Sequence, residues 1–145
     1  MQLSNQHAVA FYDLTARRFT RRLELPVKPG ITVADYFEAP HHGLALTDDG
    51  KTLCLAGRAS DYAALVSAPD LKLVATVPVG DAPGWVETAD SGNACLITNT
   101  RSDDLSIISI PERKEILRRP IGDGPKHITI APMPASVIAA IKARS

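Results

Sequence analysis

Hydrophobic residues along the chain come in short runs of about four to seven positions, and polar residues alternate with them. Turns rich in Gly, Pro, Asp and Ser separate the runs. This pattern is typical of short β-strands and of an all-β fold. It predicts eight strands in the central part of the chain, at residues 44–47, 53–56, 64–68, 73–79, 86–89, 95–98, 105–110 and 115–121.

The strands belong to a repeating unit of 42 residues. The segment "PVGDAP" at 78–83 recurs as "PIGDGP" at 120–125, so Gly80 corresponds to Gly122. The same offset relates Gly50 to Gly92 and the pair 60–61 to the Ser-Asp pair 102–103. Several independent positions that agree on one offset indicate a true repeat. Four strands in a unit of this length predict the blade of a β-propeller.

The turns fit this interpretation. Asp-Asp-Gly at 48–50 and Asp-Ser-Gly at 90–92 suit tight hairpins, because glycine adopts positive φ without steric cost. The Ser-Asp pairs suit turns in which side chains bond the backbone. The Gly-Asp-[Ala/Gly]-Pro motif is predicted to carry the chain from the outer strand of one blade to the inner strand of the next.

The chain therefore divides into parts of a stack of blades. Residues 1–30 fit the third and fourth strands of a partial blade, at 8–13 and 22–27, and residues 31–39 form an inserted loop. Residues 40–82 and 83–124 are two full blades. Residues 125–132 are expected to be the first strand of a further blade, and the tail 133–145 to contain a short helix. The fold class is a partial β-propeller of four-stranded antiparallel blades.

The repeat resembles the 40-residue YVTN β-propeller repeat. The segments that carry the likeness are "HHGLALTDDGKTLCLAG", "CLITNTRSDDLSIISI" and "LKLVATVPVGDAP", and residues 96–99 match the Tyr-Val-Thr-Asn element at three positions. Relatives of this type include YncE-like and surface-layer proteins, and more distantly quinoprotein amine dehydrogenases, nitrous oxide reductase and lactonases. The resemblance implies a ring, commonly of seven blades.

An open stack of blades leaves two apolar sheet faces exposed to water, which implies association or aggregation. The chain is expected to be a piece of a longer YVTN-type propeller. The alternatives are a protein that self-associates to complete its ring and a marginally folded remnant. We expect self-association or completion by further blades.

Charge and hydropathy exclude several partners. The chain of 145 residues has a formal net charge of zero and a pI near 6.9, which argues against nucleic acid. The basic residues at 17, 18, 21 and 22 fit a solvated face. No apolar run is long enough to span a membrane. The sequence as written lacks an export signal and predicts a cytoplasmic protein, or an exported one if its N-terminus is truncated.

The inner strands hold the candidate ligand site. Small residues are expected where blades converge on the axis, and Trp85, Glu87 and His127 depart from that expectation. With His42, they could bind a ligand in the central channel. The alternative is that Trp85 fills space beside Gly43 and that water solvates Glu87.

Other polar residues carry weaker signals. His41, His42 and His127 suggest a metal, but their spacing is unlike that of a metal site, and we expect water to satisfy them. Neither a metal nor another cofactor is predicted. Cys54 and Cys95 occupy neighbouring strand positions. The alternation of side chains along each strand does not exclude a disulfide between them. The default expectation is that both thiols pack as small hydrophobic groups.

The sequence favours a non-catalytic binding or scaffold module for an unknown protein or small ligand. Tyr36 and Phe37 in the inserted loop are candidates for a partner contact, unless they pack against the first blade. The alternative function is part of a lactonase-like or quinoprotein-oxidoreductase-like enzyme, for which Glu87 is the one acidic residue placed in the channel. A third possibility is a truncated gene product without a function of its own.

Overall fold

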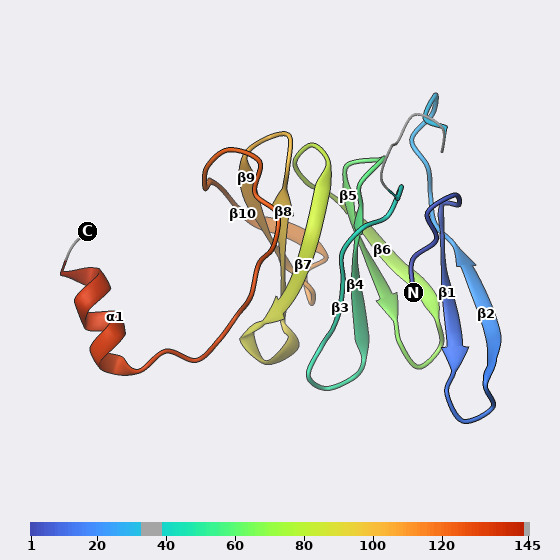
Figure 1. Ribbon diagram of the computed structural model, residues 1–145, viewed down its shortest axis with the longest axis horizontal. Coiled ribbons are helices and arrows are strands. Elements are labelled where there is room, and N and C mark those ends of the chain that lie inside the picture. The colour runs from blue at the N-terminus through green and yellow to red at the C-terminus, as the bar shows by residue number, and fades with distance from the viewer. Residues whose placement is uncertain (33–38, 144–145) are drawn as a thin grey trace.

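Three antiparallel sheets stand side by side, and each packs its face on the next (Figure 1). A computed structural model describes residues 1–32 and 39–143 of the chain. The strands are β1 (Ala8–Asp13), β2 (Arg18–Glu24), β3 (Leu44–Leu46), β4 (Thr52–Gly57), β5 (Tyr62–Ser67), β6 (Lys72–Pro78), β7 (Pro83–Ala89), β8 (Ala94–Asn99), β9 (Asp104–Ser109) and β10 (Lys114–Pro120). One 3-10 turn spans Asp90–Gly92, and one helix, α1, spans Ala135–Lys142.

The sheets are two complete blades and part of a third. Strands β3–β6 form one four-stranded meander and β7–β10 form the next, while β1 and β2 form a hairpin. The all-β class, the partial propeller and the short C-terminal helix are confirmed. Most strands lie within two residues of their predicted bounds. The second strand begins at Arg18 rather than at residue 22, because Asp13 pairs with Arg18 and leaves only residues 14–17 for the turn.

The hairpin repeats the outer half of a blade. Val9 pairs with Leu23 as Ala63 pairs with Val77, and both hairpins carry a β-bulge at the same step of the register. The N–H of Leu25 donates to the oxygen of His7, as that of Val79 donates to Asp61. An offset of 54 residues therefore relates β1 and β2 to β5 and β6. Residues 125–131 pair with no strand among the described residues, and their expected strand stays a prediction.

Two hydrophobic clusters hold the sheets together. Between the complete blades, Leu65 and Val77 pack against Ile97 and Ile108. Between the hairpin and the first blade, Val9 and Leu25 pack against a second group that includes Leu55, Ala64 and Val66. Because successive residues of a strand point to opposite faces, the first complete blade contributes to the interface on either side of it.

A disulfide joins the two complete blades. Cys54 on β4 and Cys95 on β8 are both fully buried, and their Cα atoms lie 6.5 Å apart. The structure therefore decides the question that strand parity leaves open, and the default of two separate thiols is wrong. The bond crosses the interface because the two strands turn opposite faces toward each other.

We expect the disulfide to contribute about 4 kcal/mol to the free energy of unfolding, because it closes a loop of 41 residues in the unfolded chain. Urea denaturation of the Cys54→Ala/Cys95→Ala variant should show this loss. The wild type, refolded under strong reductant, should agree with the variant within about 1 kcal/mol. A loss below about 1 kcal/mol would contradict a structural role.

Candidate functional site

Three aromatic side chains occupy equivalent positions at the entrances to successive inner strands. His42, Trp85 and His127 each lie two residues after a proline, namely Pro40, Pro83 and Pro125. The three rings lie next to one another, with Trp85 in the middle. The structure therefore brings together three of the four side chains that the sequence proposes for the channel.

Trp85 contacts one imidazole from the junction before it and another from the junction after it. Its ring centroid lies 4.4 Å from that of His42 and 4.2 Å from that of His127, and both pairs are tilted. Edge and tilted arrangements of this kind are favoured over parallel sandwiches. Two partners already cover much of the indole, so Trp85 is less open to a stacking ligand than the sequence predicts.

The close approach of two inner strands sets this geometry. A Cβ at Gly43 would lie 2.4 Å from the carbonyl oxygen of Gly84 and 2.7 Å from the nitrogen of Val86. Only glycine lets the backbones meet at this distance. The space beside Gly43 is thus filled by the backbone of residues 84–86, which corrects the interpretation that the Trp85 side chain fills it.

Hydroxyl groups at the ends of β8 fix the following junction. The N–H of Trp85 donates to Oγ1 of Thr98 at 3.2 Å, and this hydroxyl donates to the oxygen of Lys126 at 2.7 Å. Oγ1 of Thr100 donates to the oxygen of Pro125 at 3.2 Å. One strand end therefore holds Trp85 and the segment that carries His127 in a defined relation.

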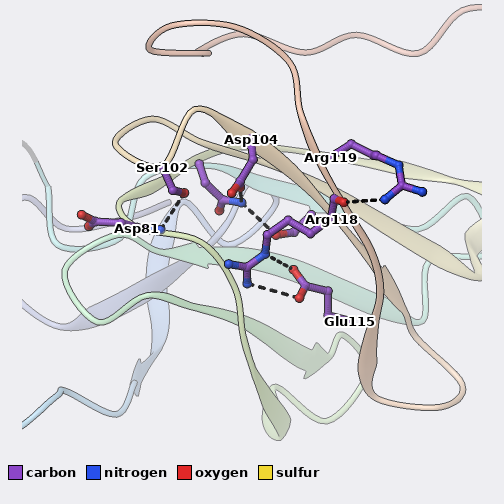
Figure 2. Close-up of polar contacts among 8 residues, drawn as sticks. Asp81, Ser102, Asp104, Glu115, Arg118 and Arg119 are labelled. Atoms are coloured by element: carbon purple, nitrogen blue, oxygen red, sulfur yellow. Dashed lines mark hydrogen bonds and ion pairs between the residues drawn. The ribbon is translucent and has the colours of Figure 1, made fainter.

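The Ser-Asp turns explain the repeated Gly-Asp-x-Pro motif. Oδ1 of Asp61 accepts from the N–H of Ala82 at 3.1 Å, and Oδ1 of Asp103 accepts from Gly124 at 2.8 Å. Ala82 and Gly124 both have positive φ, 53° and 55°. On the other side of the crossover, the N–H of Asp81 donates to Oγ of Ser102 at 2.9 Å (Figure 2). Turns of both neighbouring blades thus clamp the crossover.

Glu87, two residues after Trp85 on β7, lines an open hollow that none of the three aromatic rings lines. The hollow has a volume of about 560 Å³ and lies between β3 and β7. Its lining comprises carboxylates, aliphatic side chains and one hydroxyl: Leu44, Ala45, Leu46, Asp48, Val86, Glu87, Thr88, Ala89, Asp90 and Ile130. Among the described residues, three carboxylates and no basic side chain line it, so it is complementary to a positively charged group.

Two further predictions concern a metal site at the histidines and a partner contact in the inserted loop. Within residues 1–32 and 39–143, no three His, Cys, Asp or Glu side chains are grouped so as to share a metal ion. Tyr36 and Phe37 lie outside the described residues. Their role in a partner contact stays a prediction.

His41 forms a buried polar cluster that the sequence analysis missed. The side chain is 1% exposed, and Nε2 lies 2.9 Å from the hydroxyl of Tyr62. That hydroxyl donates to the oxygen of Pro26 at 2.7 Å, so His41 must donate to it through Nε2. The expectation that water satisfies His41 is wrong. His41 and His42 are adjacent in the sequence, and the sequence pattern does not indicate which of the two side chains is buried between the sheets.

The remaining nitrogens of this cluster have no partner. Nδ1 of His41 and both ring nitrogens of His7 are buried without a hydrogen bond among the described residues. The two rings meet edge to face at 5.8 Å. Burial, and secondarily the imidazole of His7, lower the pKa of His41 to about 4. Burial also raises the pKa of Tyr62.

We expect acid to destabilise the fold through His41. The folded pKa lies below the value of 6.5 in the unfolded chain, so this stability is present near neutral pH and is lost as the pH falls from about 6.5 to about 4. The loss amounts to about 3 kcal/mol. Urea denaturation at several pH values should show a shallower pH dependence for His41→Gln, and parallel curves would contradict the assignment.

We expect Asp61→Ala to lower the free energy of unfolding by about 2 kcal/mol, since it leaves the buried N–H of Ala82 unpaired and places alanine at a φ of 56°. Asp61→Asn keeps an acceptor oxygen and tolerates this φ, so it should lose less than half as much. The emission of Trp85 should shift only in the alanine variant. Equal losses in both variants would contradict the clamp.

Comparisons with known proteins bear on the fold. No protein-family model matches the chain, and no curated protein matches it by sequence. The chain is similar to solved structures of hydrazine synthase from Kuenenia stuttgartiensis (24% identity over 59% of this chain, TM-score 0.58) and of the dihydro-heme d1 dehydrogenase NirN in complex with DHE (21% over 85%, TM-score 0.64). It is also similar to the structure of U3-55K (13% over 79%, TM-score 0.64).

These likenesses are all below 25% identity and support the propeller-like fold alone. The chain spans 24%, 25% and 33% of the three solved chains in the same order. The names include enzymes, so fold similarity leaves both a binding and a catalytic role open. Within the described part of the chain, no helix has the length and apolar character needed to cross a membrane.

Proposed function

We propose that the chain is a non-catalytic propeller segment that binds a small ligand carrying a positive charge in the hollow lined by Glu87. One observation carries this proposal: Asp48, Glu87 and Asp90 line a concave surface together with Leu44, Leu46 and Ile130. Carboxylates above aliphatic side chains suit an ammonium or guanidinium group attached to an apolar body.

The lining supports a binding role. Among the described residues that line the hollow none is Ser, Cys or Lys, and no His or Lys of the lining stands beside its carboxylates or Thr88 as an activating base. Thr88 is the one hydroxyl there, and it donates to the carbonyl oxygen of Leu46 at 3.2 Å. The imidazoles of His42 and His127 lie against Trp85, and none of these three rings is among the residues that line the hollow.

Trp85 is the only tryptophan of the chain and precedes Val86 and Glu87 of the lining on β7, so its emission is the readout. We expect hexylamine to change the emission of Trp85 in a saturable way at millimolar concentration, whereas hexanol should do so more weakly and hexanoate least. Glu87→Gln should weaken hexylamine binding about threefold, as expected for a partly solvated charge pair. Glu24→Gln, which changes a carboxylate on β2, is the matched control and should bind as the wild type does.

Equal responses to the amine, the alcohol and the acid would contradict the proposed ligand class. Turnover of a lactone in the presence of divalent metal, abolished by Glu87→Gln, would contradict a non-catalytic role and favour the lactonase-like alternative.

We also propose that the chain is of the YVTN type and folds in an oxidising compartment. The Thr-Asn pair at 98–99 supports the first part: Thr98 bonds the next junction, and Nδ2 of the buried Asn99 donates to Asp104 at 2.5 Å and to Ser106 at 2.8 Å. The buried disulfide supports the second, because such bonds persist mainly outside reducing compartments.

A further inference from the structure

Within the described residues, the sheet β7–β10 has one face that no other sheet covers. This open face corresponds, by the repeat, to the face of β3–β6 that is buried against β7–β10. On the covered face of the first blade, one row of paired residues crosses the sheet: Ala45, Cys54, Leu65 and Ala75. The 42-residue offset converts it into the row Glu87, Leu96, Ile107 and Leu117 on the second blade. Leu65 is 1% exposed, whereas its counterpart Ile107 is only half-buried.

The outward face of the hairpin has the complementary architecture. By the offset of 54, Tyr12 and Phe19 correspond to Val66 and Leu73 of the first blade, and by a further 42 Tyr12 corresponds to Ile108. Ile108 is fully buried in the same cluster as Leu65. Tyr12 and Phe19 instead form an edge-to-face pair with exposures of 44% and 60%. Large aromatic surfaces exposed in this way mark interaction sites.

We propose that these two faces bind each other between two copies of the chain, head to tail. The contact between Leu65 and Ile108 inside one chain is then the template for a contact between Ile107 of one copy and Tyr12 of the other. The occupant of the open face is a second copy because the hairpin already packs on a sheet of this same kind, through its other face.

The segment 125–131 gives a second reason for this arrangement. Ile128 and Ile130 correspond by the 42-residue offset to Val86 and Thr88 on β7, an inner strand. Hydrogen bonds from Thr98 and Thr100 already hold the start of the segment against the last blade. The hairpin supplies the third and fourth strands of a blade, and the isolated bridge between Gln2 and Val9 lies where a second strand would pair with the third. The segment 125–131 of one copy and the hairpin of the other together make a composite blade.

The number of sheets in these 145 residues is compatible with a closed dimer. Each copy has two four-stranded sheets and a hairpin, and the hairpin of one copy would share a composite blade with the segment 125–131 of the other. Two copies of these 145 residues would then give six blades, within the range of four to eight that propellers use, whereas three copies would give nine. Head-to-tail contacts close into a ring when the rotation permits and otherwise continue as filaments.

Analytical ultracentrifugation of the wild type at micromolar concentration tests the proposal. We expect a discrete species of twice the 15.5 kDa of one chain. Ile107→Glu and Tyr12→Glu should each give a folded monomer, with an unchanged far-UV circular dichroism spectrum. Val74→Glu is the matched control, since Val74 is 41% exposed on the outer strand β6, and should remain dimeric. A monomeric wild type, aggregates without a discrete size, or a dimer that survives Ile107→Glu would overturn the proposal.

Cross-linking gives the register of the contact. The variant Tyr12→Cys/Ile107→Cys should form a covalent dimer on mild oxidation, because the native cysteines are paired and buried. Tyr12→Cys/Val74→Cys should remain uncross-linked. Equal cross-linking of the two variants would overturn the proposed register.

Discussion

Face-to-face packing of sheets is the interaction on which the rest of this structure depends. A four-stranded sheet with apolar residues on both faces is stabilised by covering those faces. The cluster that holds Leu65 and Ile108, and the disulfide between Cys54 and Cys95, show how the two complete blades cover the faces that they share. The repeat of 42 residues reflects this packing. Each unit contains four short strands and one crossover, which leads from the outer strand of a sheet to the inner strand of the next.

The crossovers serve both the stack and the candidate site. Asp61 and Ser102 clamp the same crossover from two neighbouring blades, so the distance between the blades and the position of the next inner strand are set together. The crossover therefore helps to position the aromatic residue two positions after the proline. A change in the turn at Asp61 or Ser102 is expected to alter the surroundings of the Trp85 indole ring.

Sequence patterns predict the strands and their repeat well, since both are local or strictly periodic properties. Alternation identifies which face a residue occupies, but it gives no distance between two faces. For that reason the pairing of Cys54 with Cys95 could not be predicted. The same limit applies to His41 and His42: one is buried against Tyr62 and the other contacts Trp85. Only the path of the chain after Pro40 decides which histidine points inward.

Glu87 links the proposed site to the proposed assembly. In the covered row of the first blade its counterpart is Ala45, so a carboxylate stands where the template interface has a methyl group. Closing a second copy over this face reduces the access of water to Glu87, and an unpaired buried carboxylate is unfavourable. A cationic ligand in the hollow neutralises that charge. Ligand binding and head-to-tail association then stabilise each other, because linkage is reciprocal. The affinity for an amine should accordingly rise with protein concentration in the wild type and stay constant in Ile107→Glu.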